Sequence, residues 1–189
     1  MLSRPDLTKK SSLRKHLIAT VIAAGVAGAW IAGGAAAADL AQQDKSFFLA
    51  AADAGNTEIA ASSIAQQRSP SENIRAFAAT MVTDHTKVAS ELKALAAKKG
   101  VAIPERPSIA KQTEIDKLNT VDAKKFDAEY AQKIGLAAHK DAVALFTKAS
   151  ATAVDPDVKA FAAKTLPALQ HHLEMAQSLP VSGKSSAGQ

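Results

Sequence analysis

The sequence of 189 residues contains no cysteine. This absence excludes disulfide bonds, thiol catalysis and metal sites with thiolate ligands. It also excludes a lipoprotein anchor, which needs a cysteine at the cleavage point. Aromatic residues are scarce, at 4%, and no stretch is dominated by valine, isoleucine and threonine, whereas alanine is abundant. This composition favours closely packed helices over sheets.

The chain has little net charge outside its first 38 residues. Its formal charge of +5 comes from 23 basic and 18 acidic residues, and residues 1–38 hold five of the basic residues but one of the acidic residues. The remainder therefore carries +1 and offers no basic face for nucleic acid. A glycine-rich phosphate loop and a Gly-x-Ser-x-Gly turn are both absent, so nucleophilic hydrolysis is not expected.

Residues 1–38 have the pattern of a signal peptide. Five basic residues precede an uncharged run over residues 17–38, and this run ends in four alanines directly before Asp39. A basic start, an apolar middle and small residues at the end are typical of a cleaved secretory leader. We therefore expect cleavage after Ala38 and export to the periplasm. The alternative is an uncleaved anchor facing the periplasm, because the run is about long enough to span a bilayer.

Apolar residues at helical spacing predict four long helices and one short one in the remaining chain. The long helices are expected at about 44–68, 70–99, 121–150 and 156–179, and the short one at about 110–119. Ser69-Pro70-Ser71-Glu72 is typical of a capping box with proline first in the helix, and Asp155-Pro156 repeats that start signal. The tail, residues 180–189, is small and polar and is expected to be disordered.

These elements predict an all-α domain over residues 39–179. Four helices of similar length match the four-helix-bundle template. The link at 101–110 contains Pro104 and Pro107 and reads as an extended crossover between the second and third long helices. A long crossover at this point gives ferritin-like connectivity.

Three histidines lie within apolar stripes, each on a different predicted helix: His85, His139 and His172. Glu58 holds a comparable place on the first helix. Buried polar side chains lower stability unless they are paired, so four of them in one small core require partners. The sequence leaves two interpretations open.

In the first interpretation the four side chains form a hydrogen-bonded layer that fixes the helix register, which is a common role of core histidines. In the second they bind one transition-metal ion, such as Zn, Cu, Fe or Mn, through three imidazoles and a carboxylate. Three further side chains would then be the hydrogen-bond partners that orient the rings: Asp84, Tyr130 and Asp141.

Short sequence motifs occur on each of the four long helices. They are Phe47-Phe48 and Glu58, Phe77-Ala78 with Met81-Val82-x-Asp84-His85, Phe126-Asp127-x-x-Tyr130 with His139, and Leu166-Pro167 with His172. Over about residues 44–179 this combination resembles the bacterial exported proteins of domain-of-unknown-function family 4142, often labelled outer membrane proteins. The resemblance implies a ferritin-like helical fold and no known activity.

The candidate site departs from the di-iron ferritin pattern. Di-iron ferritin-like proteins carry Glu-x-x-His on two helices. Here the residues three positions before the histidines are apolar, namely Val82, Leu136 and Leu169. Ferroxidase chemistry of the usual kind is therefore not expected.

The sequence thus predicts an exported helical bundle of unassigned biochemical function, with a binding, structural or stress-related role in the cell envelope rather than an enzymatic one. Two alternatives stay open. One is a metal-binding protein, with or without redox activity, and the other is a bundle held at the membrane by its leader. The sequence identifies no partner.

Overall fold

The computed structural model describes residues 40–179. The predicted leader and the predicted tail lie outside the described residues. Every regular element in residues 40–179 is helical, so the expected all-α class is confirmed. None of the helices in this range combines the length and the apolar character needed to cross a membrane.

The helical elements follow one another with short connections, except for the longer segment over residues 99–108. They are α1 (Gln42–Arg68), α2 (Glu72–Lys98), α3 (Ile109–Thr120), α4 (Ala123–Tyr130), the π-helix η1 (Ala131–Ala138), α5 (His139–Thr152) and α6 (Pro156–Gln177). The elements α4, η1 and α5 are continuous, so together they form one long rod where the sequence predicted a single helix. The π-helical stretch in its middle was not predicted.

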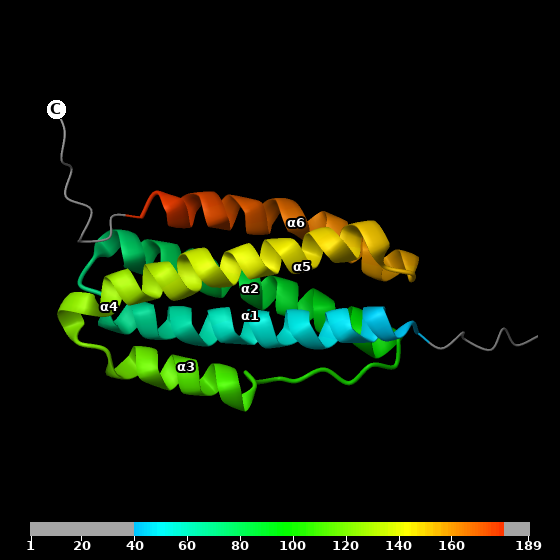
Figure 1. The fold of residues 1–189 in the computed structure, drawn as a ribbon, viewed down its shortest axis with the longest axis horizontal. Helices are drawn as coiled ribbons and strands as arrows, with labels where there is room; N and C mark the ends of the chain where they lie inside the picture. The colour runs from blue at the N-terminus through cyan, green and yellow to red at the C-terminus, as the bar shows by residue number, and fades with distance from the viewer. Residues whose placement is uncertain (1–39, 180–189) are drawn as a thin grey trace, which may run out of the picture. The chain divides into compact units, whose positions relative to one another are not determined.

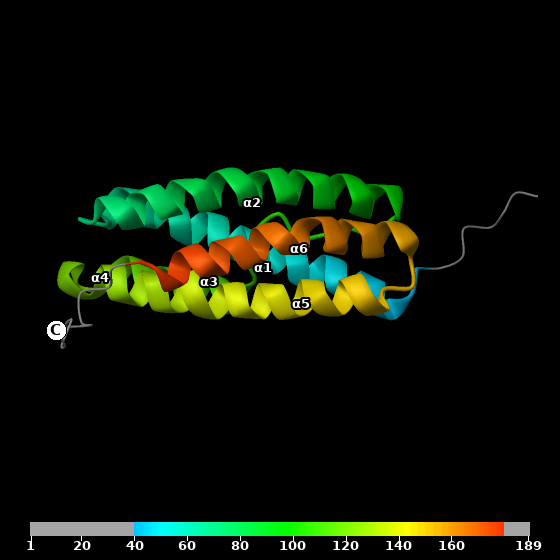
Figure 2. The same cartoon turned by 90° about the horizontal axis from the view of Figure 1, so that it is seen from above.

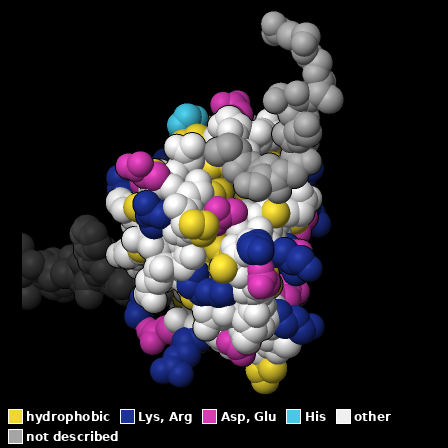
Figure 3. Space-filling view, turned by 90° about the vertical axis from the view of Figure 1, so that its left-hand side faces the viewer, with side chains coloured by type: hydrophobic (Ala, Val, Ile, Leu, Met, Phe, Trp, Pro, Cys, Tyr) yellow, Lys and Arg dark blue, Asp and Glu magenta, His cyan; other side chains and the backbone are white. Residues whose placement is uncertain are grey.

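The long helices lie side by side, with α1 against α2 and α5 against α6 (Figure 1, Figure 2). The segment between α2 and α3 runs back along α1, and the short helix α3 packs on α1. Figure 3 looks onto one end of the molecule and shows Lys and Arg side chains mixed with Asp and Glu. That face therefore has no surface of a single charge.

Side-chain caps explain where two of the helices begin. Asp155 Oδ1 accepts the backbone N–H groups of Asp157 and Val158, and Pro156 is the first helical residue, as predicted. Helix α2 starts later than predicted, at Glu72, because Ser71 is its cap. The hydroxyl of Ser69 instead accepts the N–H of Ser71 and donates to Asp127, and Pro70 precedes the helix.

Two apolar clusters make up the core. The first, called here the Phe146 cluster, includes Phe47, Phe48, Leu92, Ala142, Phe146, Val158, Phe161 and Leu169. The second, called here the Phe126 cluster, includes Ala61, Ile74, Phe77, Met81, Phe126, Tyr130, Ile134 and Ala176. Along α2, α5 and α6 the buried histidines fall between the members of the two clusters, so a polar layer separates them.

Candidate metal centre

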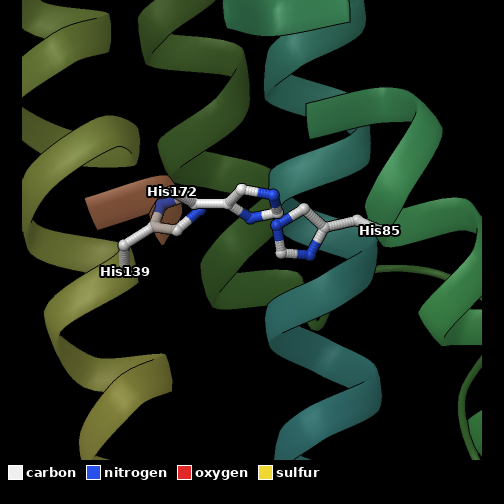
Figure 4. Close-up of side chains that lie close together, drawn as sticks. All are labelled: His85, His139 and His172. Atoms are coloured by element: carbon white, nitrogen blue, oxygen red, sulfur yellow. The ribbon is translucent and has the colours of Figure 1, made fainter. Parts of the chain in front are cut away.

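Three histidines from three helices meet in the interior. His85 lies on α2, His139 begins α5 and His172 lies on α6. Their side chains are at most 3% exposed, and each offers a ring nitrogen within 4.8 Å of those of the other two. The ring centroids are 5.3–5.6 Å apart, and Figure 4 shows the rings gathered at one point between the helices. The apolar stripes around each histidine bring this about, because they turn that side of each helix inward.

One nitrogen of each ring is engaged by a neighbouring group. His139 Nδ1 lies 2.9 Å from the carbonyl oxygen of Ile134, and His172 Nε2 lies 2.9 Å from Asp84 Oδ2. His85 Nδ1 lies 3.1 Å from Glu58 Oε2. Metal-binding histidines are usually oriented in this way, by donating the second ring N–H to a carboxylate or a backbone carbonyl.

The other nitrogen of each ring has no partner. His85 Nε2, His139 Nε2 and His172 Nδ1 are buried and make no hydrogen bond to any described residue. Buried polar atoms are almost always satisfied in folded proteins, so three unsatisfied atoms in one cluster mark a specific feature. An ion held by all three rings would use these nitrogens, because the opposite nitrogens are engaged.

The three rings are in the form that binds metals. Burial lowers the pKa of His85 to about 3 and that of His139 to about 4, and the neighbouring histidines add to both effects. Burial also lowers the pKa of His172, although its hydrogen bond to Asp84 opposes this. All three imidazoles are therefore neutral near pH 7, and a neutral ring has the free lone pair that coordination requires.

Glu58, predicted as a fourth ligand, lies beside the rings and not among the converging nitrogens. Its carboxyl contacts His85 Nδ1, and its Oε1 is 3.5 Å from His139 Nδ1. It is not part of the group whose ligand atoms lie within 4.8 Å of one another. Burial raises the pKa of Glu58 to about 8, because no cation compensates its charge in the interior. Glu58 is therefore positioned to orient the ring of His85.

The three predicted ring partners have different places in the structure. Asp84 bonds to His172. The Tyr130 hydroxyl pairs with Ser62 Oγ at 2.8 Å within the Phe126 cluster, and no hydrogen bond joins it to a histidine. Asp141 is exposed and lines a surface pocket, because it lies two residues after His139 and so on another face of the helix. The structure therefore does not support Tyr130 and Asp141 as ring partners.

The partner of His139 was not predicted from the sequence. This partner is the backbone carbonyl of Ile134, five residues earlier and inside the π-helix η1. Isolated π-turns occur often at functional sites. No residue type indicates which backbone carbonyl will accept a hydrogen bond. The only signal of the π-helix in the sequence would have been a break in the apolar stripe around Gly135.

The donor set suits one ion. Three neutral imidazoles bind Zn or Cu well and leave at least one coordination position open. Zn–N bonds of about 2.0–2.1 Å place the ligand atoms roughly 3.3 Å apart, so a bound ion would draw the nitrogens inward. Within residues 40–179 no second group of three such ligands occurs, so the described chain does not offer a paired-metal site.

Comparisons with known proteins give information about the family and the fold but none about the chemistry of the site. Residues 31–179 match the family described as "Domain of unknown function (DUF4142)". Among solved structures, the chain is similar to one titled "Crystal structure of DUF305 fragment from Deinococcus radiodurans". The identity is 14% and the TM-score 0.64, over 73% of this chain and 95% of that one. At that identity the likeness shows a shared fold alone. No functionally curated protein matches the chain.

Proposed function

This chain belongs to the DUF4142 family, and we propose that it binds a single divalent transition-metal ion between His85, His139 and His172. The family carries no assigned activity, so the proposal rests on the site. The observation that carries it is the trio of buried, unpartnered nitrogens, one from each ring. Each ring is already oriented by a partner on its opposite nitrogen.

The competing interpretation, a hydrogen-bonded structural layer, has less support. Such a layer needs donors paired with acceptors, but no histidine bonds to another histidine among the described residues. An unsatisfied buried polar group costs about 1–3 kcal/mol, and this cluster contains three such nitrogens and Glu58 Oε1. A bound cation would satisfy the nitrogens and compensate the charge of an ionised Glu58.

The ligand set also indicates which ions fit. It contains imidazole and no thiolate, a combination that suits Zn²⁺ and Cu²⁺, the strongest binders among the common divalent ions. Calcium and magnesium prefer sites made of oxygen ligands. We therefore expect a protein loaded in its native compartment to carry zinc or copper at one equivalent.

Metal content and calorimetry test the proposal. The wild-type protein should bind one equivalent of Zn²⁺ or Cu²⁺, and His172→Ala should weaken binding by about 100-fold or more. A chelator should lower the melting temperature of the loaded wild-type protein and leave that of His172→Ala unchanged. His171→Ala is the matched control, because His171 is the adjacent residue and its side chain is 67% exposed. Binding by His172→Ala equal to that of the wild type would refute the site.

Asp84 provides a second test, because it acts through His172. Asp84→Ala removes the acceptor that orients the ring, and loss of such a partner typically lowers metal affinity by about 10–100-fold. Asp84→Asn retains a carbonyl acceptor and should restore most of the affinity. A merely structural role for Asp84 would change the melting temperature of the metal-free protein and leave the affinity unchanged.

We further propose that residues 39–179 form a ferritin-like four-helix bundle that works in the periplasm. The rod of α4, η1 and α5 would be its third helix, and the segment between α2 and α3 its crossover. The leader pattern supports export with cleavage after Ala38. The intact mass of exported protein tests this, since a mature chain that retains residues 17–38 would favour the membrane-anchored alternative.

A further inference from the structure

A cavity of about 400 Å³ lies beside the histidine layer, between α1, α2 and the segment that links α2 to α3. Small-molecule sites typically span roughly 300–1,000 Å³, so the cavity is large enough for a ligand. Most of its wall is apolar, with Val88, Leu92, Ile103, Phe146 and Leu169 among the lining residues. Its polar inner wall is formed by Glu58 and His85. The cavity therefore joins the Phe146 cluster to the candidate metal centre.

The outer wall of the cavity is fixed in place. Asn56 Nδ2 donates to the carbonyl of Pro104 at 3.0 Å, and the backbone N–H of Ser108 donates to Asp53 Oδ1 at 2.6 Å. These bonds hold the linking segment to α1. The space is thus present before any ligand arrives, as in most small-molecule sites.

The charges around the cavity favour an uncharged occupant. Lys93 and Glu105 are exposed and pair with each other, so neither offers a free charge to a ligand. Glu58 lines the inner wall, and its Oε1, which is buried from solvent, makes no hydrogen bond to the described residues. An anion would lose its hydration in this apolar space without gaining a counter-ion, and the desolvation of a cation would offset its attraction to the Glu58 carboxylate.

Gly55 indicates that the open space is not filled by a side chain where one would fit. It lies in the interior of α1 and lines the cavity, and a Cβ added there would meet no atom within 4 Å. Glycine is the least favourable helix residue after proline, and no close contact requires it here. Glycine at this lining position leaves the space beside it unfilled.

We propose that this cavity binds a small, uncharged, largely apolar molecule whose single polar group forms a hydrogen bond with the Glu58 carboxyl. The apolar body lies against the Phe146 cluster, and the polar group reaches the inner wall. The site does not need a bound metal ion, so the inference stands apart from the proposed metal binding. Because Glu58 also contacts His85, a ligand at this position would touch the group that orients one metal-binding ring.

Two matched fluorescent probes test the proposal. N-phenyl-1-naphthylamine is uncharged and apolar and has one N–H donor, and 8-anilinonaphthalene-1-sulfonate has the same ring system with an added negative charge. In a fluorescence titration the wild-type protein should bind one equivalent of the neutral probe. It should bind the sulfonate more weakly by about tenfold or more.

Variants that fill the cavity provide a second test of the proposal. Gly55→Phe should weaken binding of the neutral probe by about tenfold or more, whereas Gly55→Ala leaves the space open and should bind like the wild type. Ala89→Phe fills the cavity from α2 and gives an independent result if Gly55→Phe folds poorly. Absence of saturable binding of the neutral probe to the wild type would overturn the proposal. So would equal affinity for the sulfonate, or unchanged binding in whichever filling variants fold.

The metal proposal is tested separately in the same experiment. His172 does not line the cavity, so His172→Ala should lose metal and still bind the neutral probe. Conversely, Gly55→Phe should lose the probe and still bind metal. The two proposals can therefore fail independently.

Discussion

A helical glycine has different surroundings in the two halves of the core. In the Phe126 cluster, a Cβ added to Gly135 would lie 3.2 Å from the Cβ of Ala176, so glycine there permits a close approach of η1 and α6. In the Phe146 cluster, Gly55 has open space around it and lines a cavity. The surroundings of Gly135 are closely packed, whereas those of Gly55 leave room for a ligand. The histidine layer lies between the two clusters.

Polar contacts reinforce both halves of the core. The Arg68 guanidinium lies 4.8 Å from the centre of the Phe126 ring and donates to the carbonyls of Leu118, Asn119 and Val121. These bonds join the end of α1 to the end of α3 and to the residues before the long rod. Beside the Phe146 cluster, the buried Asp44 carboxylate accepts the backbone N–H groups of Val154 and Asp155. The difference between the two glycines and the cavity beside Phe146 predict that the same change will have unequal effects in the two halves.

The largest effect is expected from removing one aromatic ring from each half. Phe126→Ala should lower the free energy of unfolding by about 3–5 kcal/mol, since Phe126 is fully buried and lies under Arg68. Phe146→Ala should cost at least about 1 kcal/mol less, because Phe146 borders a cavity and has fewer partner atoms. Urea denaturation measures both, and equal losses would contradict the difference in packing.

The histidine layer should make the stability of the metal-free protein depend on pH, with a maximum near pH 6.5. Burial lowers the pKa of His85 to about 3 and that of His139 to about 4, from 6.5, so the unfolded chain gains protons first and stability falls as the pH drops below 6.5. Burial raises the pKa of Glu58 to about 8 from 4.5, so stability falls as the pH rises through that window. Between pH 4.5 and 6.5 the two histidines outweigh the single carboxyl.

Urea denaturation of metal-free protein at pH 5, 6.5 and 8 checks this dependence. The loss between pH 6.5 and 8 should be about 1 kcal/mol, because the histidines still add a little stability over this range, and it should disappear in Glu58→Gln, which cannot ionise. The loss below pH 6.5 should persist in that variant. Stability that kept rising up to pH 8 in the wild-type protein would show that the carboxyl is ionised in the folded state.

Substituting the two glycines should give effects of opposite sign. Gly135→Ala should destabilise the protein by about 1–2 kcal/mol, because its new methyl group meets Ala176 on a neighbouring helix. Gly55→Ala should stabilise it by about 0.5–1 kcal/mol through better helix propensity. Thermal melts compare the two, and combining Gly135→Ala with Ala176→Gly should relieve the contact. The same sign for both single variants would contradict the assignment of open space at Gly55 and close packing at Gly135.

An effect of similar size is expected from removing a single hydroxyl group. Tyr130→Phe removes the partner of Ser62 Oγ and leaves that buried hydroxyl unpaired, which should cost about 1 kcal/mol. The double variant with Ser62→Ala should recover part of this loss, because neither polar atom then remains. Metal affinity should stay unchanged in both variants, since Tyr130 bonds to no histidine.

Sequence patterns predicted the parts of the molecule that depend on period and on caps. The 3.6-residue apolar stripes gave the all-α class, and they placed His85, His139 and His172 in the interior, where the structure brings them together. The cap at Asp155 followed from a side chain next to a proline. Periodicity determines which face of a helix is buried, and so these features could be found from one sequence.

Features that depend on backbone geometry and on distances between helices could not be found in this way. The bond from His139 to the Ile134 carbonyl requires a π-helix, and nothing in the residue types around Gly135 requires one. Which atoms Glu58 contacts depends on how α1 sits against α2 and α5. The cavity depends on where the segment after α2 crosses α1, and hydrogen bonds between distant residues fix that path.

The π-helix η1 also constrains which insertions and deletions the chain can tolerate. A π-helical stretch amounts to one extra residue accommodated within an α-helix, and each residue turns an α-helix by about 100°. Because the wider turns absorb the extra residue, deleting one residue between Tyr130 and His139 would restore regular α-helix and leave the orientation of α5 relative to α4 nearly unchanged. Inserting one further residue would instead rotate α5 by about 100° relative to α4. The Phe126 cluster and the histidine layer could then no longer face the same interior, and the ring of His139 would be separated from those of His85 and His172 although no ligand had been substituted.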